Sequence, residues 1–127
     1  EKEVLLGLRN NSHGAGTWCF PGGHLEFFES LEDCVYREMK EETGLEREDI
    51  VLMGSNPFAV TEDFFPEEKK HYITHYMHAH YAGNKKPEVM EKLKCLEWRW
   101  FAFEKFPNNL FIPVKNLIKQ YNYSFQG

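Results

Sequence analysis

Three glutamates in one short segment have a spacing suited to binding a metal ion. Glu38, Glu41 and Glu42 stand at i, i+3 and i+4, which places side chains on one side of a helix. With about 100° of rotation per residue, Glu38 and Glu42 point within about 20° of Leu31 and share its apolar stripe. Partly buried carboxylates that repel one another are unfavourable. A divalent cation such as Mg²⁺, which prefers oxygen ligands and leaves room for substrate phosphates, removes both problems.

An ordinary solvated acidic face is the alternative interpretation of these glutamates. Charge runs are most often exposed, and the helical angles alone leave both interpretations open. The formal net charge of −5 is a second argument for a metal, because an acidic protein needs cations to hold a polyphosphate. The same charge weighs against a nucleic acid partner, since nucleic acid binders are usually basic.

A helix must position the glutamates, and the sequence marks both of its ends. Ser30 is a good N-cap residue, with Asp33 three positions later as a weaker form of the capping box. Gly44 stands where a left-handed residue commonly ends a helix. We therefore expect the glutamates on a helix that begins at Ser30 and ends before Gly44.

The rest of the sequence is mostly strand-like. Apolar, β-branched and aromatic runs predict strands at Val4–Leu8, Thr17–Phe20, Ile50–Thr61, His71–Ala82 and Cys95–Ala102, and a short extended piece at His24–Glu26. Polar stretches predict loops at Asn10–Gly16, Glu62–Lys70 and Gly83–Lys92.

A second helix is expected near the end of the sequence. Val114, Leu117, Ile118 and Tyr121 have helical apolar spacing, and Pro113 suits the first turn. Strands and helices in this order predict an α+β fold with a mixed sheet between helices. The length of 127 residues fits a single domain over residues 1–127.

The three cysteines, Cys19, Cys34 and Cys95, are far apart and form no CxxC pair. This pattern favours a reducing compartment, so we expect a cytoplasmic protein. No apolar run reaches the roughly 20 residues of a membrane helix, and we expect no membrane partner.

The segment from Gly23 to Leu45 resembles the complete Nudix box. The matching residues are Gly23, Glu29, Arg37, Glu38, Met39, Glu41, Glu42, Gly44 and Leu45. Such a set at fixed spacing arises by chance in on the order of one in ten million chains. The flanking residues 5–9, 20–26 and 98–101 are most similar to MutT-type nucleoside triphosphate pyrophosphatases.

The resemblance implies a Nudix-type α/β/α sandwich whose box forms a loop–helix–loop catalytic motif. Glu38, Glu41, Glu42 and the Gly23 carbonyl would bind Mg²⁺, for which Mn²⁺ could substitute, and one glutamate would be the general base in some members. Glu29 and Arg37 would form an ion pair that supports the metal ligands. The implied reaction is hydrolysis of a nucleoside triphosphate, or a related nucleoside diphosphate derivative, to a nucleoside monophosphate and pyrophosphate, as in nucleotide-pool sanitising.

Five further residues are candidates for binding a small nucleotide substrate. Arg9 could grip a phosphate in a bidentate manner, or could be an exposed residue at a strand end. His24 could touch a phosphate or be a plain loop histidine. Phe20, Thr74 and Trp100 could border a base pocket, with Trp100 as the preferred stacking residue. Core packing is the alternative for these three.

Other functions compete with this interpretation. The substrate could be a nucleotide sugar, a dinucleotide or another diphosphate, or the chain could be a non-catalytic nucleotide-sensing or protein-binding Nudix module. The intact acidic positions of the box argue against the module. Histidines 71, 75, 78 and 80 fall on two faces of a strand, which disfavours a zinc site. A homodimer is expected because MutT-like proteins often form one.

Two departures from the family pattern stand out. Family members usually have an apolar strand before the one at Val4–Leu8, and this sequence has none, so we expect that the strand lies before Glu1 or that the sheet has lost it. Close relatives also often have glycine where Phe28 stands. That position is variable, so we expect Phe28 to reshape the loop without ending catalysis.

Overall fold

The computed structural model describes residues 2–11 and 13–121. Its central sheet joins three strands in the order β2-β1-β7, with β1 at Glu3–Arg9, β2 at Trp18–Cys19 and β7 at Cys95–Ala102. Both ladders are antiparallel. A parallel bridge between Trp18 and Leu110 extends the sheet beyond β2.

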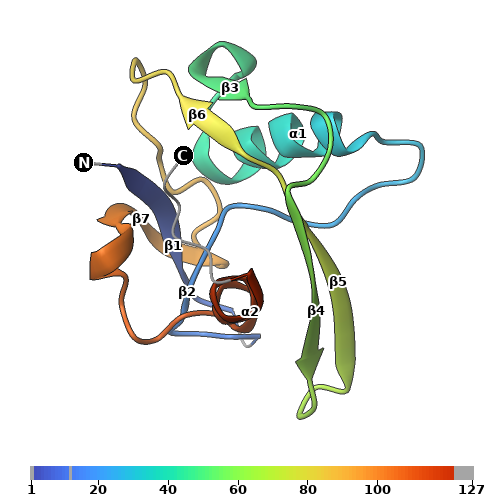
Figure 1. Ribbon diagram of the computed structural model, residues 1–127. Coiled ribbons are helices and arrows are strands. Elements are labelled where there is room, and N and C mark those ends of the chain that lie inside the picture. Colours follow the sequence, from blue (N-terminus) through green and yellow to red (C-terminus); the bar gives the residue numbers. More distant parts are fainter. Residues whose placement is uncertain (1, 12, 122–127) are drawn as a thin grey trace.

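Two further strand pairs complete the β-structure of the described residues. β3 at Ile50–Leu52 pairs with β6 at Ala79–Tyr81, and β4 at Ala59–Phe65 pairs with β5 at Lys70–Tyr76. The β4–β5 hairpin extends away from the central sheet at the lower right of Figure 1.

Two α-helices lie among these sheets. Helix α1 spans Leu31–Thr43, and helix α2 spans Ile112–Tyr121 and packs against β4. In Figure 1, α1 is drawn in the upper half of the view, at the height of β3 and β6, whereas α2 lies lower, next to the β4–β5 hairpin. The predicted α+β class, a Nudix-type sandwich with helices and mixed strands, is therefore confirmed. No described helix has both the length and the apolar character needed to cross a membrane.

The predicted ends of α1 are confirmed in detail. The Asp33 backbone N–H donates to the Ser30 hydroxyl at 3.0 Å. Gly44 has a φ of 78° and donates its N–H to the Lys40 carbonyl at 3.0 Å. A glycine suits this left-handed position because it has no Cβ to clash. These two caps fix where the glutamate-bearing turns begin and end.

The two long strands predicted at Ile50–Thr61 and His71–Ala82 are wrong as single elements. The first breaks after β3, because residues 53–58 contain Gly54 with a φ of 113°, followed by Ser, Asn and Pro. The second breaks after β5 at Tyr76, and the chain resumes as β6. The break lets each half pair with a different strand, since β5 pairs with β4 and β6 with β3.

The loop predicted at Glu62–Lys70 is also too long. Strand β4 continues to Phe65, and only residues 66–69 form the turn, where Lys69 has a φ of 57°. The piece predicted at His24–Glu26 forms no strand. The loops near residues 10–16 and 83–92 are present, although residue 12 lies outside the described part.

The hydrophobic core is divided between the central sheet and the hairpin. Leu6, Val114 and Leu117 have 1% or less of their surface exposed. Leu117 packs with Ala59 and Tyr76 of the hairpin, which joins α2 to β4 and β5. The second helix is therefore confirmed, with its predicted apolar face inward; the side chain of Tyr121 lies outside the described part.

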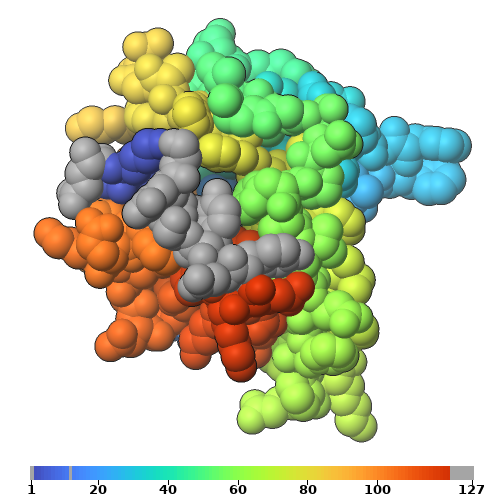
Figure 2. Space-filling model, in the orientation of Figure 1, coloured from blue at the N-terminus to red at the C-terminus, as the bar shows by residue number. Residues whose placement is uncertain are grey.

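The loop before α1 exposes two aromatic rings. Phe27 is 88% exposed and Phe28 96%, and their ring centroids lie 4.2 Å apart. Phe28 has a φ of 62°, a conformation that glycine adopts more easily. In Figure 2 this loop stands out from the body of the molecule in light blue.

Candidate active site

Two glutamates of α1 converge on a pair of glycines. The Gly22 backbone N–H donates to Glu42 Oε1 at 3.1 Å. Glu38 lies so close to Gly23 that a Cβ there would fall 2.1 Å from Glu38 Oε2. Only glycine leaves this space free. The structure therefore brings together three of the predicted metal-site residues, Gly23, Glu38 and Glu42.

Arg37 connects the loop to the other acidic positions. Its Nε lies 2.7 Å from Glu29 Oε2 and its Nη2 lies 3.0 Å from Glu29 Oε1, a bidentate ion pair that confirms the predicted contact. Its Nη1 donates to Glu38 Oε1 at 2.6 Å and to Glu41 Oε1 at 3.2 Å. Its Nη2 also donates to the His24 carbonyl at 2.9 Å. One guanidinium thus fixes both the loop and two of the three candidate ligands.

The surroundings of Glu42 disfavour the ionised form of its carboxyl group. Burial raises the pKa of the Glu42 carboxyl to about 8; the charge of Glu38 acts in the same direction, and the Gly22 N–H opposes it. Glu91, from the loop before β7, also raises the pKa of Glu42 and so lies near it. A cation bound beside Glu42 would stabilise its ionised form.

Glu29 and Arg37 show the opposite behaviour. Hydrogen bonds from Arg37 lower the pKa of Glu29 to about 2, with further help from the Glu26 backbone N–H at 3.0 Å. The same bonds raise the pKa of Arg37. Both groups are thus held ionised, which suits a supporting pair rather than a group that exchanges protons.

The site suits a divalent cation at two of its carboxylates. Among residues 2–11 and 13–121, no three acidic, histidine or cysteine side chains gather as metal ligands. Glu41 is half exposed and directed toward Arg37. Glu38 and Glu42, however, converge beside the Gly22–Gly23 backbone with too little positive charge around Glu42. Glu41 can become a third ligand if its carboxylate leaves Arg37 Nη1, from which it lies 3.2 Å away, and binds the ion.

Arg9, the last residue of β1, makes its contacts outside the glutamate cluster. Its Nε donates to the His13 carbonyl at 2.9 Å, and its guanidinium lies 3.9 Å from the centre of the Phe111 ring. Arg9 and Glu42 both influence the pKa of Cys19, so each of them lies near that thiol. Arg9 would have to give up part of these contacts to grip a phosphate.

Three other predicted substrate residues gather around β5. His24 stacks on Tyr72 with ring centroids 5.7 Å apart, and Phe20 meets Tyr76 edge to face at 6.0 Å. Thr74 lies between the two tyrosines on the same strand face and donates its hydroxyl to Asp63. Strand β5 thus lies against both ends of the segment that carries the two glycines.

Trp100 lies in a different place. Its ring packs against Tyr81 of β6, with centroids 5.1 Å apart. Trp98, two residues earlier, donates its indole N–H to the Glu42 carbonyl at 3.1 Å and covers Gly7. Trp98 therefore supports the last turn of α1 directly.

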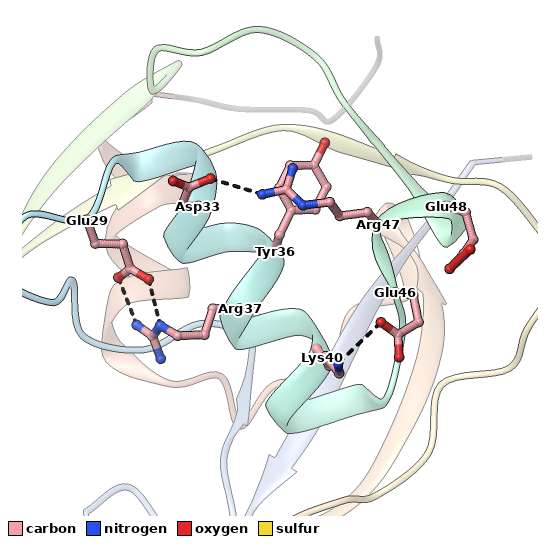
Figure 3. A pocket seen from close by; sticks show the side chains of 8 residues that line it. All are labelled: Glu29, Asp33, Tyr36, Arg37, Lys40, Glu46, Arg47 and Glu48. Atoms are coloured by element: carbon pink, nitrogen blue, oxygen red, sulfur yellow. Dashed lines mark hydrogen bonds and ion pairs between the residues drawn. The ribbon is translucent and has the colours of Figure 1, made fainter.

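A pocket on the outer face of α1 ends at the Glu29–Arg37 pair (Figure 3). Its other walls are Asp33, Tyr36, Lys40, Glu46, Arg47 and Glu48. Arg47 stacks on the Tyr36 ring at 4.0 Å and pairs with Asp33 at 3.0 Å, while Lys40 lies 3.6 Å from Glu46. These two ion pairs are formed between residues of the pocket wall itself.

The chain is similar to known proteins in both sequence and structure. The NUDIX domain profile matches residues 1–121. The chain belongs to the Nudix family. A crystal structure of a MutT NUDIX hydrolase from Burkholderia pseudomallei matches with a TM-score of 0.77 and 27% identity, covering 93% of this chain and 87% of that one.

Two curated Nudix relatives have different substrates. The NAD-capped RNA hydrolase NudC of Vibrio vulnificus (strain CMCP6) is 32% identical over 107 residues, 84% of this chain and 36% of that protein. The oxidized purine nucleoside triphosphate hydrolase of Mus musculus is 28% identical over 106 residues, 84% of this chain and 62% of that protein. The chain spans less than two thirds of the length of both. The comparisons thus show a Nudix domain, and Nudix hydrolases generally use divalent metal ions.

Sequence reasoning missed two acidic residues of this Nudix domain. Glu91 lies in a polar loop, and nothing in its local pattern places it beside Glu42. The polar run from Glu62 predicts a loop at Asp63, yet this residue is fully buried in β4. Its position between two inward-facing residues, Thr61 and Phe65, is the strand alternation that could have located it.

Proposed function

We propose that this Nudix domain, with Mg²⁺, hydrolyses a nucleoside triphosphate to a nucleoside monophosphate and pyrophosphate, in the manner of MutT-like sanitising enzymes. A related nucleoside diphosphate derivative would give a nucleoside monophosphate and the phosphorylated remainder. The observation that carries the proposal is the convergence of Glu38 and Glu42 on Gly22–Gly23, braced by the Glu29–Arg37 pair. The similarity to the mouse oxidized purine nucleoside triphosphate hydrolase supports the choice of substrate.

The residues of the chain divide the work. Glu38, Glu41, Glu42 and the Gly23 carbonyl would hold Mg²⁺, which when bound acidifies the attacking water and neutralises phosphate charge. The ion pair between Arg37 and Glu29 holds the loop before α1 against the helix. Water attacks a phosphorus, one of the glutamates takes its proton, and pyrophosphate leaves. Arg9 and His24 would contact phosphates.

The nucleoside would lie toward β5. Phe20 and Thr74 are proposed to contact the base or sugar, because the tyrosines on either side of Thr74 touch the segment that leads to the metal site. Trp100 packs near Tyr81, so we propose that it borders the substrate only if the nucleoside turns toward β6. Mutation of each residue separates the two placements by its effect on KM.

A substrate panel tests the proposed reaction. Nucleoside triphosphates, oxidised purine nucleotides, nucleotide sugars, dinucleotides and NAD-capped RNA would be incubated with Mg²⁺, and the products followed by ³¹P NMR. We expect monophosphate and pyrophosphate from triphosphates. NAD-capped RNA is the second candidate, on the similarity to NudC, although the net charge of −5 disfavours an RNA partner. Turnover of none of these compounds would favour a non-catalytic module.

We further propose a homodimer and a cytoplasmic location. Exposed apolar side chains such as Phe27 and Phe28 offer surface that a second subunit could bury. Multi-angle light scattering at high protein concentration should give twice the mass of one chain. A monomer mass would contradict the dimer without affecting the proposed reaction.

A further inference from the structure

Asp63 is a fully buried carboxylate that does not belong to the metal site. It faces inward from β4 with 0% of its surface exposed. Its oxygens lie 2.9 and 3.1 Å from the Thr61 hydroxyl, and Asn116 of α2 donates to it from 2.9 Å. The Thr74 hydroxyl of β5 donates to it as well. Asp63 thus gathers donors from β4, β5 and α2.

The hydrogens of this network can be counted. A carboxylate only accepts hydrogen bonds, and a hydroxyl has a single hydrogen to donate. Thr74 gives that hydrogen to Asp63, so its oxygen can meet a further group only as an acceptor. Asn116 directs its amide nitrogen to Asp63 and to the Glu62 carbonyl at 3.3 Å, which leaves its amide oxygen as an acceptor too.

The half-buried members of the network, Thr74 and Asn116, are those that a ligand could reach, since Thr61 and Asp63 are enclosed. Thr74 lies between Tyr72, which stacks on His24, and Tyr76, which meets Phe20. His24 and Phe20 flank the segment that holds Gly22 and Gly23. The acceptor at Thr74 therefore stands on the strand face that adjoins the phosphate site.

We propose that Asp63 fixes the hydrogen-bond polarity of Thr74, so that the domain selects nucleotides that present an N–H donor, such as an exocyclic amino group, to this strand face. This specificity rests on the proposed nucleotide substrate. Asp63 acts as a positioning residue, because it reaches the ligand only through Thr74. A nucleotide with a carbonyl at the same place would leave two acceptors facing one another, which is a strong basis for rejection.

Substitutions change this polarity in opposite ways. Thr74→Val keeps the shape of the side chain but removes the acceptor. Thr74→Ser keeps the hydroxyl and is the matched control. Asp63→Asn keeps the size of Asp63 and places an amide N–H in the network. If that N–H donates to Thr74, the Thr74 hydrogen turns toward the ligand.

The experiment measures binding, so it does not depend on turnover. Isothermal titration would give Kd values for two product pairs that differ by one amino group, GMP with IMP and AMP with purine riboside monophosphate. For at least one pair, we expect wild type and Thr74→Ser to bind the amino compound about tenfold more tightly. Thr74→Val should bring the ratio of the two Kd values in that pair close to one. Asp63→Asn should reduce the preference for the amino compound.

Several outcomes would overturn the inference. The first is the same ratio of Kd values in wild type, Thr74→Ser and Thr74→Val. The second is a wild-type preference for the compound without the amino group. The third is no binding of any of the four nucleotides. Thermal melting identifies a variant that fails to fold, and if Asp63→Asn does so, the two Thr74 variants still decide. Selective binding without hydrolysis of any triphosphate would uphold the inference and contradict the proposed reaction.

Discussion

The Gly22 backbone N–H donates a hydrogen bond to Glu42 Oε1 at 3.1 Å, and this contact ties the last turn of α1 to the glycine pair 20 residues earlier. The side chain is half-buried, and this burial raises the pKa of the carboxyl to about 8. The glycine segment therefore does more than end a strand. It brings backbone atoms against the carboxylates of Glu38 and Glu42. A metal ion bound there would supply the positive charge that stabilises ionised Glu42.

Gly23→Ala should abolish most activity with little loss of fold. A Cβ at Gly23 would lie 2.1 to 2.6 Å from the Glu38 carboxyl atoms, so Glu38 must move away. We expect kcat to fall at least tenfold, because metal sites are sensitive to ligand displacement. Gly22→Ala is the matched control, since a Cβ there meets nothing within 4 Å and the N–H to Glu42 remains. Equal losses in both variants would contradict this account.

Metal-free stability should fall as the pH rises. The folded-state pKa of Glu42, about 8, is above its ordinary value of 4.5. Its stabilising contribution is therefore fully present below pH 4.5 and is lost as the pH rises toward 8. Urea unfolding in EDTA between these limits should show this slope in wild type and a smaller slope in Glu42→Gln. Mg²⁺ should flatten the wild-type curve, because it stabilises the ionised carboxylate. An identical slope in the variant would refute the assignment.

Arg37→Lys should weaken the site because lysine cannot replace the bidentate contact with Glu29 or bridge to Glu38 and Glu41. We expect metal affinity or kcat to fall by about 10- to 100-fold. Arg47→Lys is the control, since the contacts that Arg47 makes are an exposed pair with Asp33 and a stack on Tyr36, both away from the glutamates of the site. Steady-state kinetics across a Mg²⁺ titration would separate affinity from kcat. Unchanged kinetics in Arg37→Lys would contradict the bracing role.

Acid should weaken the fold through Glu29. Arg37 lowers the pKa of Glu29 from 4.5 to about 2, so the pair stabilises the protein above pH 4.5 and loses its effect as the pH falls toward 2. Glu29→Gln should remove this part of the acid dependence. Thermal melting from pH 5 to pH 2 would reveal it, and an unchanged profile in the variant would show that the pair contributes nothing to stability.

Chelation should stop turnover reversibly. Activity should vanish in EDTA and return with Mg²⁺ or Mn²⁺, because the carboxylates alone cannot neutralise the phosphate charge. A continuous assay of phosphate release after added pyrophosphatase would follow both steps. Full turnover in the chelator would rule out the metal-dependent mechanism.

The local signals of the sequence predicted the helix and its box well. Ser30 and Gly44 marked the ends of α1, and the Glu29–Arg37 pair formed as the family resemblance implied. These features depend on nearby residues or on a short motif. The direction of Glu41 toward Arg37 did not follow from helical angles, because a cationic neighbour competes for the carboxylate when no metal is bound.

Features that depend on tertiary packing were not predicted. Strands β5 and β6 pair with different partners, and the break between them has only a weak signal in the sequence. Asp63 is polar and so resembles a loop residue. Its burial depends on hydrogen-bond donors such as Asn116 of α2, which lies far away in the sequence. Glu91 reaches Glu42 only because the loop before β7 returns to the last turn of α1, where the Met90 N–H meets the Glu42 carbonyl at 3.4 Å.

The most direct test of the catalytic role of α1 is Glu42→Gln, with kcat and metal-free melting temperature measured on the same preparation. The change keeps the size of the side chain and removes the charge that would bind metal. We predict that kcat falls by at least 100-fold on any substrate the wild type turns over, since the lost interaction is strongest in the transition state. The metal-free melting temperature should stay the same or rise, because glutamine removes the cost of ionising a half-buried carboxyl. Wild-type kcat in the variant would contradict the assignment of this helix as the catalytic one, and a lower metal-free melting temperature would indicate a structural role instead.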